Sequence, residues 1–176
     1  KWIIDFFFSI KLDKDTVKGN WKAYKKIQTP KRKYQLTKQK FEYKPEAKIR
    51  TRFIDWIKTK TAKEDWGDGE LMDIESYFTT TEKVTSVNPS VDMLTEEEVS
   101  KLTKADIYVL RNSIYAKHGY SFKKRQLRVF FDSHSWYMPV HVNIKNDLTD
   151  IEKQNIKLLL RYEKYAEEYY DEFGRG

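Results

Sequence analysis

The stretch LTKADIYVLRNSIYAKHGYSF, residues 102–122, carries the strongest structural signal in this 176-residue chain. Thr103 and Asp106 form a capping box, in which each side chain accepts a hydrogen bond from the other residue's backbone amide at the start of a helix. Apolar residues then repeat at helical spacing: Ile107, Leu110 and Ile114. Gly119 closes the pattern, because glycine readily adopts the left-handed conformation that ends many helices. The stretch therefore predicts one helix with a defined beginning and end.

Two more capping boxes lie on either side of this helix. Thr95 with Glu98 and Thr149 with Glu152 have the same spacing, and each opens a helical stretch. Apolar residues predict the buried faces of two further helices: Leu127, Phe130 and Phe131 in one, and Ile151, Leu158, Tyr162, Tyr165 and Tyr169 in the last. We therefore expect residues 94–176 to form a compact domain of about four helices.

The first part of the chain has strand periodicity instead. In WIIDFFFSIKL, residues 2–12, every even position is apolar, and the alternation restarts at Val17 after a polar turn. A period of two with one buried face is typical of a β-strand, so the pair predicts a β-hairpin. Three further stretches predict strands: KYQL (33–36), KFEY (40–43) and LMDIESYFTTT (71–81). RTRFIDWIKTK, residues 50–60, fits either a helix or a strand.

These patterns predict an α+β protein in two parts. We expect residues 1–83 to be a small, basic, mostly antiparallel β-domain that precedes the helical domain at 94–176. Residues 84–93, VTSVNPSVDM, have the composition of a linker, with Asn88-Pro89 at its centre.

Composition excludes several classes of protein. Mean hydropathy is −0.81, and no segment approaches the roughly 20 apolar residues that span a bilayer. The opening run KWIIDFFFSI, interrupted by Asp5, does not predict a signal peptide. The chain does not begin with Met, and we interpret it as a processed or truncated product. With no cysteine, neither a disulfide framework nor a thiolate metal site is possible.

The net charge of +7 is unevenly distributed. Residues 1–90 carry 20 Lys and Arg against 13 Asp and Glu, whereas residues 91–176 carry 14 of each. A basic patch in the first half lies near Tyr24 and Tyr34: Lys25, Lys26, Lys31, Arg32 and Lys33. Cations beside aromatic rings suit single-stranded nucleic acid, and the same patch suits an anionic envelope polymer or lipid headgroups. Lysine on an exposed strand also prevents edge-to-edge pairing without any ligand.

The end of the helix at 104–117 has two interpretations. In the structural one, Gly119 stands just after the helix and Tyr120 packs back on Tyr115, as in a Schellman motif. Lys117 and His118 then lie in the last turn, where the helix dipole favours cations. In the functional one, the same two residues form part of a binding site at an exposed helix end.

The motifs of the second half resemble the YARHG domain family, named for a pattern seen here as Tyr115-Ala116-Lys117-His118-Gly119. Four ordered blocks carry the resemblance over about residues 94–165: Leu110 to Gly119, Leu127 with Phe131, Trp136-Tyr137-Met138-Pro139, and Leu148 with Glu152 and Asn155. Lys117 departs from the arginine usual in the family. Lysine keeps the charge but loses the planar fork that binds carboxylates or phosphates in bidentate fashion.

The resemblance implies a location more than a chemistry. YARHG domains are expected outside the bacterial cytoplasm, in lipoproteins and membrane-attached proteins, sometimes beside peptidase domains, and are thought to bind cell-envelope components. The family has no established catalytic residue. We therefore expect an extracytoplasmic protein, secreted, periplasmic or attached to the cell surface, whose partner is an envelope component or a surface protein.

The candidate binding residues lie in the motif and in the blocks around it: Arg111, Lys117, His118, Trp136 and Tyr137. Trp136 has an alternative role as a core residue, with Pro139 fixing the turn. His118, His134 and His141 are the three histidines, and their spacing matches no metal-ligand motif, so we expect neither a metal nor another cofactor. No catalytic signature is present, and we expect a non-catalytic binding or accessory module. Two alternatives remain open: a cell-envelope hydrolase with its catalytic acid in the β-domain, and a single-stranded nucleic-acid binder.

Overall fold

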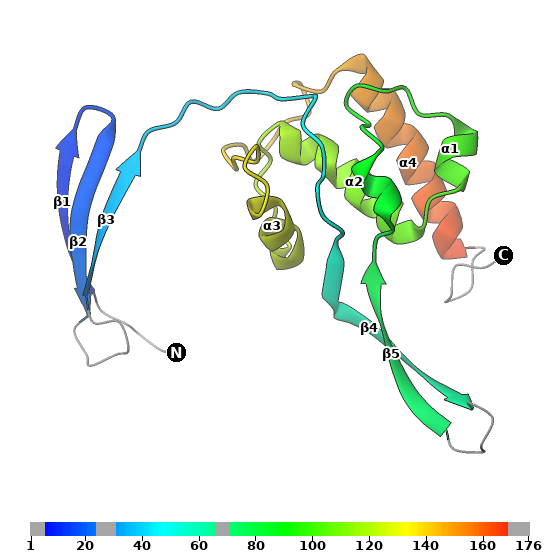
Figure 1. The fold of residues 1–176 in the computed structure, drawn as a ribbon. Coiled ribbons are helices and arrows are strands. Elements are labelled where there is room, and N and C mark those ends of the chain that lie inside the picture. The colour runs from blue at the N-terminus through cyan, green and yellow to red at the C-terminus, as the bar shows by residue number, and fades with distance from the viewer. Residues whose placement is uncertain (1–5, 24–30, 66–70, 169–176) are drawn as a thin grey trace. The chain divides into compact units, whose positions relative to one another are not determined.

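The computed structural model describes residues 6–23, 31–65 and 71–168, and the chain divides into two compact units at Lys40 and Phe41 (Figure 1). Antiparallel strands precede the helices, which confirms the α+β class. The first unit carries 12 Lys and Arg against 3 Asp and Glu, a net charge of +9, and the second carries 22 against 24, a net charge of −2. The excess of positive over negative charge therefore lies in the first 40 residues.

The first unit is a three-stranded antiparallel sheet in the order β1-β2-β3. Its strands are β1 (Phe6–Asp13), β2 (Thr16–Ala23) and β3 (Lys31–Thr37). The predicted hairpin is present, joined by a two-residue turn in which Lys14 has a φ of 48°. KYQL lies within β3, as expected. The hydroxyl of Tyr34 reaches across Gly19 to the carbonyl of Ser9, and a Cβ at Gly19 would lie 2.4 Å from that hydroxyl. Glycine at this position lets the ring cross the sheet.

The apolar face of this sheet is not covered as the periodicity predicted. Ile10, Leu12 and Leu36 are exposed, Leu12 to 75%. A face of this kind is buried when a second layer packs on it, and three strands supply a single layer.

In the part that the structure describes, the second unit has four α-helices, one 3-10 helix and one hairpin (Figure 1). Its elements are β4 (Ile54–Asp65), β5 (Leu71–Thr79), the 3-10 helix η1 (Glu82–Thr85), α1 (Glu96–Ser100), α2 (Lys104–Lys117), α3 (Arg125–Asp132) and α4 (Asp150–Glu168). All three predicted capping boxes form, with reciprocal hydrogen bonds between each threonine and its acid. The predicted core of α2 and α3 is also buried: Ile107, Leu110, Ile114, Leu127, Phe130 and Phe131.

The ambiguous stretch at 50–60 becomes strand β4, which pairs with β5 in an antiparallel hairpin. The pairing shifts register between Asp55 and Thr59, so the ladder is irregular at this point. At the base of the hairpin, Phe53 is buried and packs edge-on against Phe130, with ring centroids 5.3 Å apart. Phe78 of β5 packs against Tyr108 of α2 at 6.0 Å. The hairpin thus belongs with the helices through an aromatic cluster.

The structure places the boundary between units at residue 40 instead of residue 83. Residues 84–93, expected to be a linker, carry some of the most buried positions in the chain: Val84, Asn88, Pro89 and Ser90. Asn155 of α4 holds this segment, because its side-chain amide donates to the carbonyls of Pro89 and Asp92 and accepts from the amide of Leu94. Turn composition described the local backbone correctly and missed the packing that polar side chains provide.

KFEY forms no strand, although its alternation is real. Burial alternates from Phe41 to Ile49 without a partner strand, and every second side chain of this extended segment packs against the rest of the second unit. We call residues 41–50 the entry segment. It brings Phe41, Tyr43 and the carbonyl of Pro45 to the end of α2.

The buried face of α4 also differs from the prediction. Its most buried residues are Glu152, Asn155, Ile156 and Leu159, which follow helical spacing. Ile151, Leu158 and Tyr162 are only partly buried and Tyr165 is exposed, whereas Tyr169 lies outside the described residues. Because two polar residues begin the buried face, the apolar pattern of the sequence predicts the neighbouring stripe instead.

Candidate functional site

The end of α2 is a Schellman motif centred on Gly119. The amide of Tyr120 donates to the carbonyl of Tyr115 at 3.1 Å, and the amide of Gly119 donates to the carbonyl of Ala116 at 2.9 Å. Gly119 has a φ of 69°, which strongly favours glycine. A Cβ there would lie 2.8 Å from the ring of Phe41 and 2.9 Å from the carbonyl oxygen of Met138. The predicted helix end is therefore correct, and other segments cover it.

Because of that cover, Lys117 and His118 are not exposed as the functional interpretation required. Their exposed fractions are 3% and 4%. The entry segment passes over one side of them, and the first turn of α4 lies against the other. A helix end can be recognised from its own sequence, whereas its cover comes from residues that are distant along the chain.

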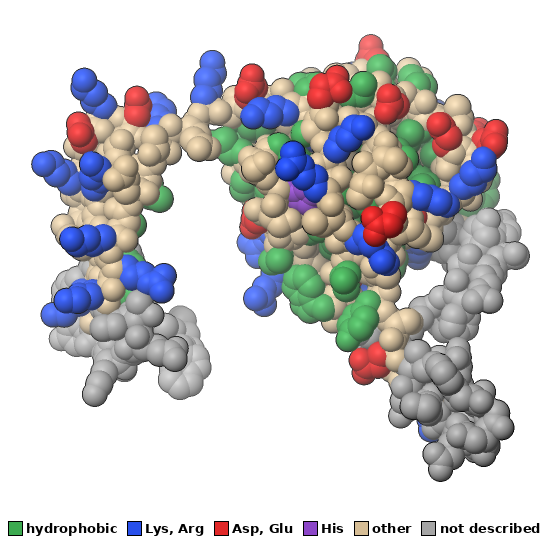
Figure 2. Space-filling model, viewed as in Figure 1, with side chains coloured by type: hydrophobic (Ala, Val, Ile, Leu, Met, Phe, Trp, Pro, Cys, Tyr) green, Lys and Arg blue, Asp and Glu red, His purple; other side chains and the backbone are tan. Residues whose placement is uncertain are grey.

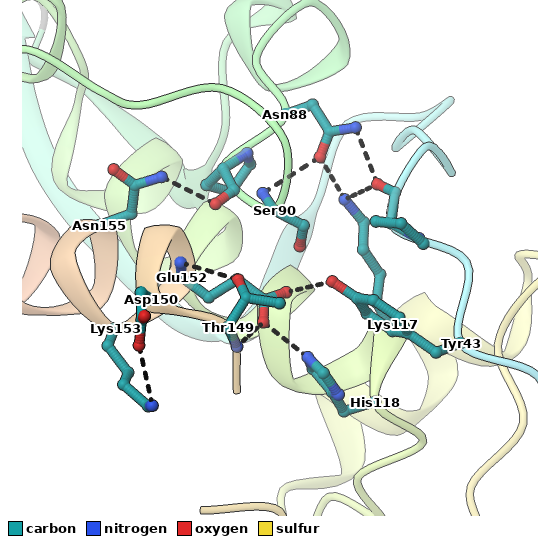
Figure 3. Close-up of polar contacts among 12 residues, drawn as sticks. Tyr43, Asn88, Ser90, Lys117, His118, Thr149, Asp150, Glu152, Lys153 and Asn155 are labelled. Atoms are coloured by element: carbon teal, nitrogen blue, oxygen red, sulfur yellow. Dashed lines mark hydrogen bonds and ion pairs between the residues drawn. The ribbon is translucent and has the colours of Figure 1, made fainter. Parts of the chain in front are cut away.

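Glu152, which is fully buried, lies at the centre of a polar cluster (Figure 3). Its Oε2 lies 2.7 Å from Nε2 of His118 and accepts from the amide of Thr149 at 2.9 Å. Its Oε1 accepts from the hydroxyl of Tyr43 at 3.0 Å. The Tyr43 ring stacks on the His118 ring, with centroids 4.3 Å apart. One carboxylate thus caps α4, holds the motif histidine and fastens the entry segment.

Lys117 serves the other side of the entry segment. Its ammonium donates to the carbonyl of Pro45 at 3.1 Å and to the side-chain oxygen of Asn88. The amide of Asn88 donates to the same Pro45 carbonyl at 2.9 Å (Figure 3). Both acceptors of Lys117 are single uncharged oxygens, so bidentate recognition of an anion is not what this position provides. A lysine satisfies these contacts despite the arginine usual in the family.

The electrostatics of the cluster follow from burial and pairing. Burial raises the pKa of Glu152, but hydrogen bonds from His118 and Thr149 outweigh it, so the pKa lies below the ordinary value and the carboxylate is ionised. Burial and the charge of Glu152 raise the pKa of Tyr43. Burial lowers the pKa of Lys117 to about 8. The Ser90 hydroxyl is buried without a hydrogen bond of ordinary geometry, although it is near enough to Tyr43 and Glu152 to affect their pKa values.

The other three predicted site residues make structural contacts elsewhere in the second unit. Arg111 forms a bidentate ion pair with Glu163 at 2.8 and 3.2 Å, which joins α2 to α4. The indole of Trp136 donates to the carbonyl of Lys48 at 3.1 Å, and the hydroxyl of Tyr137 donates to the carbonyl of Tyr120 at 2.8 Å. The five residues therefore do not form one exposed groove.

The basic patch divides between described and undescribed residues. Lys25 and Lys26 lie outside the described residues, whereas Lys31, Arg32 and Lys33 are exposed on β3. The strand register adds lysines that the sequence interpretation did not select. Lys11 lies opposite Lys18, and Lys22 lies opposite Lys31. With Lys33, which faces Asn20, these residues share one face of the sheet, and we call Lys11, Lys18, Lys22, Lys31 and Lys33 the lysine face.

A small open pocket adjoins the polar cluster. It has a volume of about 240 Å³ and is lined by Phe41, Tyr43, His118, His141 and Asp147. Of these five residues, only His118 is predicted from the sequence as a binding residue, and the spacing of His118 and His141 predicts no metal site. Glu152 had a signal in its capping box and family block, whereas nothing local marks Tyr43 or Asp147. In the described ranges, no three His, Asp or Glu side chains are grouped to hold a metal ion.

The second unit is thus a small helical module in which the end of α2, the first turn of α4 and the entry segment meet at one buried polar cluster. Residues 83–164, just under half of the chain, match the family model of the YARHG domain. YARHG domains are typically found in extracellular proteins. Searches of curated proteins and of solved structures each find no match. Among the described residues, no helix has both the length and the apolar character to cross a membrane.

Proposed function

We propose that the protein is a non-catalytic binding module that acts outside the bacterial cytoplasm, where its first unit attaches it to an anionic polymer of the cell envelope. The lysine face carries this proposal. Its five lysines are exposed, and two pairs of them lie directly opposite each other on neighbouring strands. Like charges in that position destabilise a sheet by roughly 0.2–1 kcal/mol a pair. An anionic ligand would relieve the repulsion between these lysines, and this relief would favour its binding.

Shape and net charge support the same ligand class. A depression of about 550 Å³ is lined by three of these lysines together with Ser9, Asn20, Trp21 and Arg32. Asp13 is the acid that shares this face among the described strands. Figure 2 shows many Lys and Arg side chains and few acidic ones on the visible face of the first unit. A polymer with repeated negative charges is the partner that such a surface attracts.

The test compares two variants with the same change in net charge. One replaces the lysine face by glutamine at all five positions. The other replaces five exposed lysines of the second unit: Lys44, Lys101, Lys123, Lys145 and Lys153. Binding to purified anionic cell-wall polymer, polyphosphate and a single-stranded oligonucleotide is measured across a salt series, and circular dichroism checks folding.

We expect the lysine-face variant to lose about tenfold or more in affinity and to show a salt slope shallower by about 2 to 3, whereas the second variant changes little. Equal losses in both variants would show that net charge alone is responsible and would contradict the proposal. A strong preference for the oligonucleotide over the other polyanions would favour a nucleic-acid binder instead.

The absence of catalysis is part of the proposal and has its own test. Peptide and glycan substrates of the envelope are incubated with the protein, and turnover is followed by mass spectrometry. We expect no turnover above a buffer control. Turnover that an Asp or Glu substitution abolishes would establish the hydrolase alternative.

A further inference from the structure

We propose that the pocket lined by Phe41, Tyr43, His118, His141 and Asp147 binds an organic cation, such as a lysine or arginine side chain or a quaternary ammonium group. This site belongs to the second unit. Its ligand is a cation, whereas the ligand proposed for the lysine face is an anion. It therefore stands independently of the proposed function above.

Aromatic rings form most of the wall. The Phe41 and His141 rings meet edge to face with centroids 5.2 Å apart, and the Tyr43 ring lies over His118. The π-faces of phenylalanine and tyrosine attract cations, and the attraction grows when water is displaced. Gly119 beneath Phe41 makes this wall possible, because a side chain there would collide with the ring.

Carboxylates supply the charge. Asp147 is exposed at the pocket, and no side chain of the described residues pairs with its carboxylate. Behind the Tyr43 and His118 rings lies Glu152, ionised and fully buried. His118 contacts Glu152 directly, whereas Lys117, which also feels the charge of Glu152, donates to Pro45 and Asn88. The lining residues include neither lysine nor arginine, so an anion would find no fixed positive partner there.

The size of the pocket limits the ligand. At about 240 Å³ it is smaller than the roughly 300–1,000 Å³ typical of sites for drug-sized molecules. One side-chain head or one trimethylammonium group suits this volume. Such a site anchors a single group of a larger partner.

The experiment titrates the full chain with small probes and follows the backbone amides and histidine rings by NMR. The cations are choline, N-acetyl-lysinamide and N-acetyl-argininamide. The neutral probes are 3,3-dimethylbutanol, which is isosteric with choline, N-acetyl-norleucinamide, and methyl glucoside as a representative sugar. Asp147→Asn tests the exposed carboxylate, and Asp150→Asn is the matched control, because Asp150 is exposed and is not among the pocket-lining residues.

We expect the cations to shift resonances of His141 and its neighbours with millimolar affinity, and the neutral probes to bind about tenfold more weakly or not at all. Asp147→Asn is expected to weaken binding of the cations about fivefold, because it removes an exposed charge partner. Asp150→Asn is expected to leave binding of the cations unchanged. Preference for the two amino-acid amides identifies a protein partner, and preference for choline identifies a quaternary ammonium headgroup; both support the site. Equal binding of neutral isosteres, binding of the glucoside alone, no binding at all, or an unchanged Asp147→Asn variant would overturn it.

Discussion

Lys117 and His118 are neighbours in the chain and adjacent in the structure, yet they hold different partners. His118 pairs with a buried charge, whereas Lys117 is itself a buried charge that pairs with uncharged oxygens. The pairing of His118 with Glu152 stabilises the fold at neutral pH, whereas the burial of Lys117 carries a desolvation cost. Both residues of the motif therefore act first through the folding of the second unit.

Replacing Glu152 by glutamine should destabilise the protein by about 2–4 kcal/mol at pH 7, because the pairing with His118 is lost in a buried site. Glu98→Gln is a close control, since Glu98 occupies the same capping-box position in α1 and is exposed. Urea unfolding at pH 7 measures both variants. Similar losses would mean that capping alone explains the role of Glu152.

Lys117 should make stability rise with pH over a defined window. Its folded pKa of about 8 lies below the ordinary 10.5 of lysine, so above pH 8 the unfolded chain binds more protons than the folded one. The free energy of unfolding of the natural chain should therefore increase between pH 8 and 10 relative to Lys117→Met, by up to about 1.4 kcal/mol per pH unit. Lys117→Arg provides the second comparison, because arginine does not titrate in this range.

Urea unfolding at half-unit pH intervals measures this difference for both variants. A difference that stays flat from pH 8 to 10 would contradict a depressed pKa at Lys117. The raised pKa of Tyr43 lowers the stability of all these proteins above pH 10 and cancels in the difference. The window ends near pH 10 because the lysine of the unfolded chain, with its ordinary pKa of 10.5, begins to lose its own proton there.

At the scale of the elements, the entry segment is part of the second unit, although it precedes residues 83–164, which match the YARHG model. It supplies the Tyr43 hydroxyl, the Pro45 carbonyl, the Lys48 carbonyl and the Arg50 amide, each paired with a residue of the helical part. Removing it would take the Tyr43 hydroxyl from Glu152 and the Pro45 carbonyl from Lys117, and it would open the core beside these buried charges. Buried polar groups without partners are costly, so we expect the matched segment alone to be insufficient.

A fragment of residues 83–176 should therefore lose cooperative unfolding, whereas residues 41–176 should retain it. Near-ultraviolet circular dichroism and urea unfolding distinguish the two fragments. A cooperative transition in the shorter fragment, with the midpoint of the longer one, would show that the entry segment only rests on the surface.

The elements that sequence predicted well are those whose signals are local. Three capping boxes, the Gly119 helix end and the first hairpin all depend on residues within a few positions of each other. The predictions that failed concern distant partners: KFEY alternates like a strand but has no partner strand, and the buried face of α4 begins with Glu152 and Asn155. Exposure of Lys117 and His118 belongs to the same group, because the residues that cover them come from positions 41–50 and 149–152.

At the scale of the whole molecule, charge and fold divide at the same residue. The unit at 1–40 has a net charge of +9 and the unit at 41–176 a net charge of −2. Counting by halves of the sequence concealed this contrast, because acidic residues between 41 and 90 offset part of the basic excess. Ligands of opposite sign can therefore be assigned to different units.

Removing residues 1–40 should reverse the ion-exchange behaviour of the protein and leave the rest folded. At pH 7 the full chain should bind a cation exchanger, and residues 41–176 should bind an anion exchanger instead. The thermal unfolding midpoint of the second unit should stay within about 4 °C, because a loss below 1 kcal/mol shifts the midpoint of a domain of this size by about 4 °C at most. A larger fall would mean that the two units stabilise each other.

The entry segment is fastened largely through its main chain, and this affects how such a domain can vary. The carbonyls of Pro45 and Lys48 and the amide of Arg50 are present whatever side chains stand at those positions, provided that the backbone stays extended and position 50 is not proline. Substitutions at 44, 46 and 48 thus leave these bonds intact, since those side chains are exposed. A family model recognises residue identities, so its match begins only where side chains make the contacts. The folded unit here begins at residue 41, some forty residues before the matched segment.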